Sequence, residues 1–104
     1  EKGKLGIGVD WNQNYLHPGS MLTSMVKRVD LAIYDSFKQI QTGTWKAGVT
    51  HRGLKEGGVD WVLDKDNRAV VTPAIEKKVN EVKANIINGK TKVVDYRAAN
   101  SCPV

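Results

Sequence analysis

Cysteine is almost absent from this chain of 104 residues, which contains only Cys102. A single cysteine cannot form an internal disulfide, and together with two distant histidines, His17 and His51, it forms no pattern typical of a metal site. A catalytic cysteine would need a positioned base, whereas Cys102 is third from the end, in a tail that we expect to be frayed. We therefore expect no metal, no cofactor and no cysteine chemistry.

Long apolar runs are also missing. No stretch approaches the roughly 20 apolar residues that a membrane-spanning helix needs, and the first residues show no basic and apolar signal segment. The chain opens on Glu1 rather than methionine, so we expect a piece of a longer protein or a mature product. Its length is enough for one domain and too short for two, and its 40% apolar and 26% charged residues are typical of a soluble globular protein.

The basic residues are scattered rather than clustered, although the net charge is +5. There is no arginine-rich run, and no aromatic residues alternate with basic ones as they do in proteins that bind single-stranded nucleic acid. The charge pattern therefore favours a solvated surface, and we expect no nucleic-acid partner.

The chain is organised around residues 5–27. The apolar run Leu5–Val9 predicts a buried strand of a mainly parallel sheet, and Asp10 follows it directly. After a polar loop and a turn at His17–Gly19, residues 21–23 could form a short strand or the entrance to a helix. A carboxylate at the carboxyl end of a buried strand, with Lys27 in the first turn of the next helix, would lie where open α/β sheets bind ligands.

Two amphipathic helices are predicted. Ser24 is a good N-cap for the first, which should end at Gly43, and Thr72 and Pro73 are a good N-cap and first position for the second, which should stop at Gly89. Apolar residues at three- and four-residue steps form their stripes: Val26, Val29, Ile33, Phe37 and Ile40 in the first, and Ile75, Val79, Val82 and Ile86 in the second.

The remaining apolar segments predict strands. Residues 45–51 and 58–63 are expected to pair as a hairpin or close antiparallel pair through the turn-rich segment 52–57, and a polar turn follows at 64–67. A last strand is expected at Val93-Val94, with Tyr96 nearby. The order strand, possible strand, helix, strand, strand, helix, strand indicates an α/β or α+β domain.

One cluster of side chains is suited to chemistry. The chain has no G-x-G-x-x-G dinucleotide fingerprint between strand and helix, no phosphate-binding loop, no H-E-x-x-H and no G-x-S-x-G. Asp10 and Lys27 remain, because a carboxylate can accept hydrogen bonds from both hydroxyls of a vicinal diol while an ammonium donates. From their spacing alone, a ligand site and a purely structural role for the two residues are both open.

Four segments resemble one protein family in order and spacing. These are G-V-D-W-N-Q at 8–13, M-L-T-S-M-V-K-R-V-D at 21–30, G-L-K-E-G-G-V at 53–59 and I-I-N-G-K-T-K-V at 86–93. They are similar to the basic membrane protein (Bmp/Med) family, lipoproteins that are the substrate-binding components of ABC transporters and include purine nucleoside receptors. The resemblance extends from about Leu5 to about Val94.

The resemblance implies a fold and a site. The fold would be α/β, part of a type I periplasmic-binding-protein-like structure, with residues 1–104 forming a single, partial C-terminal lobe. The aspartate of the G-V-D motif and the lysine after T-S contact the ribose in nucleoside-binding members, and Asp10 and Lys27 match them. Gln13 matches the D-x-D-Q pattern, whereas Asn12 replaces the usual acidic residue and Trp11 is bulky. The aromatic residues that stack on the base belong to other parts of the family's chain.

The function implied is uptake of purine nucleosides. The protein would bind them without covalent chemistry, by closure of two lobes about a hinge near Trp45 and Val93, and pass them to an ABC permease. Its place would be the periplasm or cell envelope, with a lipid anchor on the full-length parent. Two alternatives stay open: a small α/β enzyme acting on sugars or nucleosides, and a fragment that binds nothing and self-associates through its exposed sheet.

Overall fold

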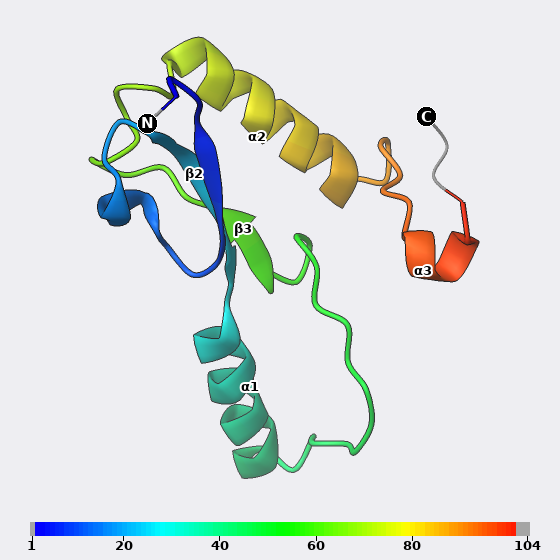
Figure 1. Cartoon of the computed structure of the whole chain (residues 1–104). Coiled ribbons are helices and arrows are strands. Elements are labelled where there is room, and N and C mark those ends of the chain that lie inside the picture. Colours follow the sequence, from blue (N-terminus) through cyan, green and yellow to red (C-terminus); the bar gives the residue numbers. More distant parts are fainter. Residues whose placement is uncertain (1, 102–104) are drawn as a thin grey trace.

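The computed structural model describes residues 2–101, in which a three-stranded sheet is combined with helices (Figure 1). In chain order the elements are β1 (Gly6–Asp10), the 3-10 turn η1 (Asn14–Leu16), β2 (Met21–Lys27), α1 (Val29–Gln41), β3 (Val59–Trp61), α2 (Pro73–Ile87) and α3 (Tyr96–Ala99). The expected mixture of strands with two long helices is confirmed.

Strand β2 is the centre of the sheet. It pairs in parallel with β1, so that Asp10 is opposite Val26, and antiparallel with β3, so that Lys27 is opposite Val59. The parallel arrangement expected for the first strand is therefore found, but only in one of the two described pairings. The predicted hairpin between residues 45–51 and 58–63 is wrong, because β3 forms its hydrogen bonds with β2 instead.

The first long helix begins later than its apolar spacing predicts. Ser24 is not an N-cap but a buried residue in β2, and Lys27 is the last residue of that strand rather than part of a helix. Val26 and Val29 have helical spacing by coincidence, whereas this segment pairs with β1 over most of residues 21–26 and with β3 at residues 25–27, which provides backbone hydrogen-bond partners in a sheet. The helix ends as predicted, with Gly43 in the left-handed conformation just beyond it.

Two further predicted strands are absent from the described chain. Residues 45–51 are an exposed loop, and the segment around Val93 and Val94 is a loop that leads into the short helix α3, which contains Tyr96. Apolar composition was not sufficient in either case, because neither segment finds a strand to pair with. Cys102 lies outside the described residues.

Helix α2 agrees closely with its local signals. The Thr72 side chain accepts a hydrogen bond from the Ile75 N–H (3.3 Å), and Pro73 occupies the first turn, where its missing N–H is not needed. Gly89 follows the helix with φ 74°, a conformation that favours glycine.

Apolar burial is limited. The prediction that both faces of residues 5–9 are covered is wrong, because Ile7 and Val9 are more than half exposed; Val71 is the one fully buried apolar side chain among the described residues. The chain exposes 8430 Å², whereas a compact monomer of 11.5 kDa exposes about 5,800 Å². Its radius of gyration, 16.7 Å, also exceeds the roughly 13 Å of a compact domain of this length.

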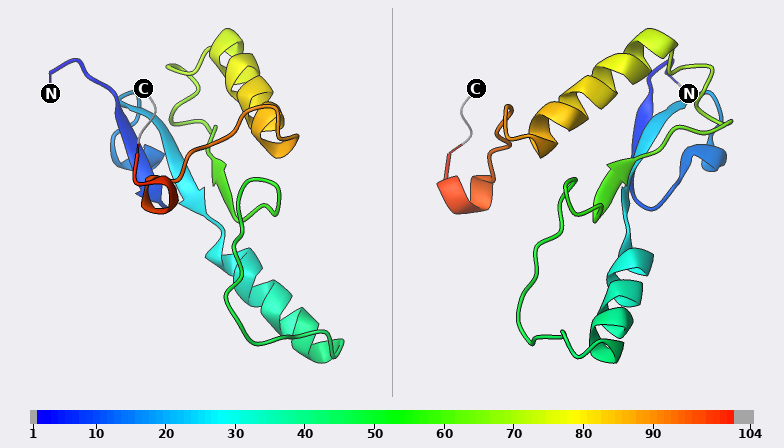
Figure 2. Two further views of the ribbon diagram at one scale, coloured as in Figure 1. Left: turned by 90° about the vertical axis from the view of Figure 1, so that its right-hand side faces the viewer. Right: turned by 180° about the vertical axis from the view of Figure 1, so that it is seen from behind.

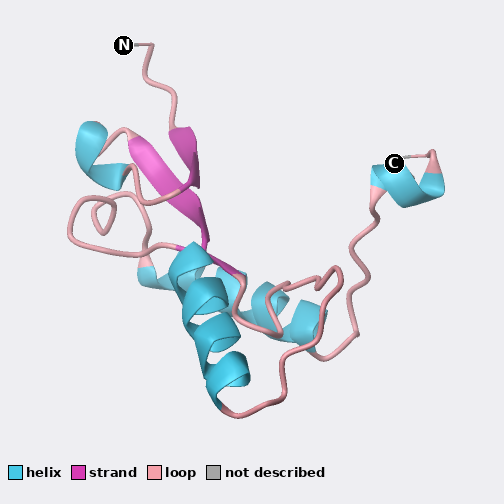
Figure 3. Cartoon of the chain, turned by 90° about the horizontal axis from the view of Figure 1, so that it is seen from below, coloured by secondary structure: helices cyan, strands magenta, loops and turns pink. Residues whose placement is uncertain are grey.

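The shape explains these values. Helix α1 extends away from the sheet beyond the end of β2, and a long loop returns from its far end to β3 (Figure 2). Figure 3 shows α3 set apart from the strands at the end of another loop. The apolar stripe of α1 is consequently exposed, with Phe37 69% and Ile40 60% accessible.

Candidate functional site

Asp10 and Lys27 meet at one edge of the sheet. Each is the last residue of its strand, and β1 and β2 are parallel neighbours, so that their carboxyl ends lie together. Lys27 Nζ is 2.6 Å from Asp10 Oδ1. The Lys27 side chain is 54% exposed and the Asp10 side chain 59% exposed, so both retain polar positions that face solvent. The chemistry expected of the pair needs this proximity and accessibility, although Lys27 reaches its place from a strand and not from a helix.

The backbone of Asp10 has an unusual conformation. Its φ is 77°, in the left-handed region that residues with a side chain rarely adopt, and it turns the chain sharply out of β1. The Gln13 side-chain amide donates to the carbonyl of Val9 (2.8 Å), while the Gln13 N–H donates to the Ser24 hydroxyl (3.0 Å). Gln13 therefore uses both groups to hold the turn that follows β1.

The other two candidates differ in exposure. Asn12 is engaged with the protein: its side chain donates to Asp64 Oδ2 (2.7 Å) and accepts from the N–H of Asn14 (3.0 Å). Trp11 is 54% exposed, and its ring centroid lies 5.9 Å from that of Tyr15 at an interplanar angle of 54°, a tilted aromatic pair. Of the five predicted residues, Asp10, Lys27 and Trp11 thus present accessible surface. Asn12 and Gln13 instead form hydrogen bonds that tie the loop to Asp64, to Ser24 in β2 and to the Val9 carbonyl.

An open pocket of about 280 Å³ adjoins Lys27. Residues at the end of β2, in the first turns of α1, in the loop before β3 and at the start of β3 line it: Lys27, Arg28, Val29, Ala32, Arg52, Gly58 and Val59. All three cations are paired, because Lys27 contacts Asp10, Arg28 contacts Asp30 (2.7 Å) and Arg52 contacts Asp35 (2.5 Å). The hydrogen bonds from the Arg28 guanidinium to the Asp30 carboxylate lower the pKa of Asp30 and raise the pKa of Arg28.

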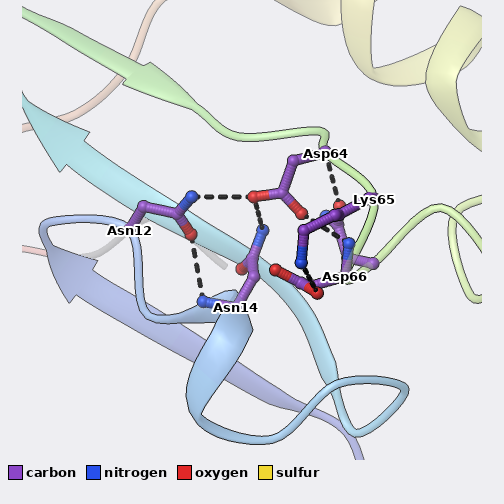
Figure 4. Close-up of polar contacts among 6 residues, drawn as sticks. Asn12, Asn14, Asp64, Lys65 and Asp66 are labelled. Atoms are coloured by element: carbon purple, nitrogen blue, oxygen red, sulfur yellow. Dashed lines mark hydrogen bonds and ion pairs between the residues drawn. The ribbon is translucent and has the colours of Figure 1, made fainter.

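A polar cluster behind the site was not predicted from the sequence. Asn14, Ser24 and Asn67 are fully buried, and each is hydrogen-bonded. Asp64 joins this cluster (Figure 4). Its partial burial raises its pKa, but hydrogen bonds from Asn12, Asn14 and backbone N–H groups outweigh this effect, so that the pKa of Asp64 lies below the ordinary value of 3.8. No local signal connects Asp64 to a loop that is 52 residues away in the chain.

The described residues contain neither a candidate metal cluster nor a candidate membrane span. Among residues 2–101, no group of three or more histidine, cysteine, aspartate and glutamate side chains could hold a metal ion. No helix in the same part of the chain is long and apolar enough to cross a membrane.

The chain matches known proteins over most of its length. The model of the Bmp family, described as ABC transporter substrate-binding protein PnrA-like, matches residues 1–96. Basic membrane protein D of Borreliella burgdorferi is 36% identical over 89 residues, which are 84% of this chain and 26% of that protein. An uncharacterized lipoprotein of Pyrococcus abyssi is 46% identical over 65 residues, which are 61% of this chain and 16% of that protein.

A solved structure has the same fold. It is a solute-binding protein of an ABC transporter system from Aeropyrum pernix K1, with a TM-score of 0.64 and 25% sequence identity, covering 86% of this chain and 32% of that one. The chain spans about a quarter or less of the length of the curated relatives named above. Because the family model matches residues 1–96, the chain belongs to the Bmp family of PnrA-like ABC transporter substrate-binding proteins.

Proposed function

We propose that this chain supplies the ribose-binding part of a purine nucleoside site in the substrate-binding component of an ABC transporter. The observation on which the proposal depends is the exposed Asp10–Lys27 pair. Two adjacent hydroxyls could donate to the Asp10 carboxylate and accept from the Lys27 ammonium, in place of part of the present ion pair. Trp11, next to Asp10, would add exposed aromatic surface against the sugar.

The charges around the site favour an uncharged ligand. Lys27, Arg28 and Arg52 face the adjoining pocket, but a carboxylate neutralises each of them. A phosphate group would have to displace these carboxylates, whereas a nucleoside would bring only hydroxyls and a neutral base. This balance supports a nucleoside rather than a nucleotide as the ligand.

We further propose that residues 1–104 form a single, partial C-terminal lobe and that the rest of a longer protein completes the cleft. The high exposed area of the chain supports this, because it leaves surface that the rest of the protein could cover. Ligand sites of this kind bury 70% or more of the ligand between their walls, as a rough rule, so a second wall is needed. The protein would lie in the periplasm or cell envelope with a lipid anchor, and an ABC permease would receive the nucleoside. The family is one of transporter binding proteins, not enzymes, and we propose no covalent step.

Lobe closure belongs to the same proposal. The hinge would involve the segments near Trp45, in the loop that returns from α1, and near Val93, in the loop after α2. Small-angle scattering of the full-length parent with and without nucleoside tests it, because closure should reduce the radius of gyration on binding. An unchanged radius would rule closure out.

Calorimetric titration of the full-length parent with inosine, adenosine, guanosine and ribose tests the ligand. We expect nucleoside binding that is lost in Asp10→Ala and in Lys27→Ala, and much weaker binding of 2′,3′-dideoxyinosine, which lacks the vicinal diol. Lys78→Ala is the matched control, because Lys78 forms a comparably exposed ion pair with Glu81 on α2, away from the site. No response to any nucleoside would leave the family membership intact and refute the ligand.

A second candidate is favoured by the exposed apolar stripe of α1. Val29, Ile33, Phe37 and Ile40 are each more than half exposed, so that the isolated chain could bury them against the same stripe of a second copy. In an antiparallel pair, Asp30 near the start of one helix would approach the end of the partner helix that carries Lys38. Light scattering should then give a dimer mass that Phe37→Glu reduces to a monomer and Gln39→Glu does not. A monomer at all concentrations would exclude it.

A further inference from the structure

The Asp64 carboxylate connects the turn after β3 to the loop after β1. Its Oδ2 accepts hydrogen bonds from the side-chain amides of Asn12 (2.7 Å) and Asn14 (3.3 Å), and its Oδ1 accepts one from the N–H of Asp66 (2.9 Å) (Figure 4). Three N–H donors thus converge on two carboxylate oxygens. An asparagine at this position would offer only one acceptor oxygen, and its amide group would face another donor.

The loop that contains residues 12–14 is also hydrogen-bonded to the central strand β2. The buried Ser24 hydroxyl donates to Asn14 Oδ1 (2.8 Å) and accepts from the N–H of Gln13 (3.0 Å). Asn14 is itself fully buried and forms hydrogen bonds with both Ser24 and Asp64. Residues 12–14 are therefore held between the central strand and the turn at Asp64.

The place of Asp10 depends on this loop. Asp10 leaves β1 in the left-handed conformation, which is unfavourable for a residue with a side chain and persists only when the surroundings impose it. The contact that closes the turn around Asp10 is the Gln13 side chain on the Val9 carbonyl, and Gln13 is adjacent to the two asparagines that Asp64 holds. If residues 12–14 were released, Asp10 could relax away from Lys27.

We propose that Asp64 is a positioning residue of the Asp10–Lys27 site. It acts through Asn12 and Asn14, which fix the turn that points Asp10 toward Lys27, and it does not itself contact the ligand. The part of this inference that concerns ligand affinity rests on the proposed nucleoside function. The part that concerns the loop does not, because the loop can be observed without ligand.

The variant Asp64→Asn, made in the full-length parent, tests the inference by two measurements. Hydrogen exchange at the N–H groups of Gln13 and Asn14 should become at least tenfold faster, because both groups lie in the released loop. Affinity for inosine should fall about tenfold with unchanged stoichiometry, as expected when a buried hydrogen-bonding group loses its partner. Asp66→Asn is the matched control, with the same change of charge two residues away, and should alter both quantities less than twofold.

A double variant distinguishes loss of the link between residues 12 and 64 from general unfolding of the protein. In Asn12→Asp/Asp64→Asn the donor and acceptor exchange places, so that the link between residues 12 and 64 can form again while the carboxylate at 12 still accepts from the N–H of Asn14. Partial recovery of amide protection and affinity relative to Asp64→Asn is expected. Unchanged exchange and affinity in Asp64→Asn would overturn the inference. Faster exchange in a parent that binds no nucleoside would refute the ligand and support the positioning of the loop.

Discussion

Lys27 Nζ lies 2.6 Å from Asp10 Oδ1, although 16 residues and an intervening loop separate the two in the chain. Parallel pairing of β1 with β2 is the cause, because it places the carboxyl ends of both strands at the same edge of the sheet. The pair is more than half exposed on both sides. A pair in this setting is suited to contact a ligand and contributes little to holding the fold.

The first prediction follows from that exposure. Asp10→Ala should change the free energy of unfolding by less than about 1 kcal/mol, because ion pairs in contact with water contribute little to stability. Relief of the left-handed backbone is not expected to alter this, since alanine is no better suited to φ 77° than aspartate. Urea titration followed by circular dichroism measures the change. A loss above 2 kcal/mol would show that Asp10 has a mainly structural role.

The second prediction concerns the stability of the fold at low pH. Hydrogen bonds hold the pKa of Asp64 below its ordinary value of 3.8, so the folded state binds its proton less readily than the unfolded state does. The stabilisation is therefore complete above about pH 4 and is lost as the pH falls through the lower folded-state value. Thermal unfolding from pH 7 to pH 2 should show a drop in midpoint in this range that is smaller in Asp64→Asn. Parallel curves for the two proteins would contradict the assignment.

Elements defined by contacts between residues near in sequence were predicted well, whereas elements defined by pairing between distant segments were not. The ends of α2 were predicted correctly, because Thr72, Pro73 and Gly89 act through contacts within one turn of helix. The start of α1 was not, since whether residues 24–27 form a strand is decided by pairing with β1 and β3, which are distant in sequence. Residues 45–51 have a strand-like composition but find no strand to pair with in the described chain.

The same distinction applies to the site. Asp10 and Lys27 could be proposed together because the end of a buried strand is a common place for ligands and because the family resemblance marks both. Asp64, Ser24 and Asn14 could not, since their roles arise only when loops far apart in sequence meet. A D-K-D-N sequence at 64–67 predicts a polar turn, and nothing in it indicates which loop that turn will hold.

The third prediction concerns close packing behind Asp10. A Cβ atom added at Gly8 would lie 2.6 Å from Ser24 Oγ and 3.0 Å from Gln13 Cβ, too close for either contact. Gly8→Ala should therefore lower the free energy of unfolding by about 1–3 kcal/mol, the usual cost of overpacking. Gly6→Ala is the control in the same strand, because its nearest neighbour is the flexible Met21 side chain at 3.2 Å. Equal losses in urea titrations of the two variants would show that the contact with Ser24 is not decisive.

The last prediction concerns α1, a helix that extends away from the sheet (Figure 2). Its apolar stripe is exposed, and a helix of 13 residues without tertiary packing is only marginally stable in water. Amides of residues 33–41 should therefore exchange with solvent much faster than those of the central strand β2, in a peptide-resolved hydrogen-exchange experiment on the isolated chain at low concentration. Arg52→Ala should accelerate them further, because the Arg52 side chain bonds to Asp35 on this helix. If the chain pairs with a second copy, raising the protein concentration should slow amide exchange in α1 and leave exchange in β2 unchanged.

Strong protection of the α1 amides at every concentration would mean that the helix packs against the rest of its own chain. That result would contradict the exposure of its apolar stripe.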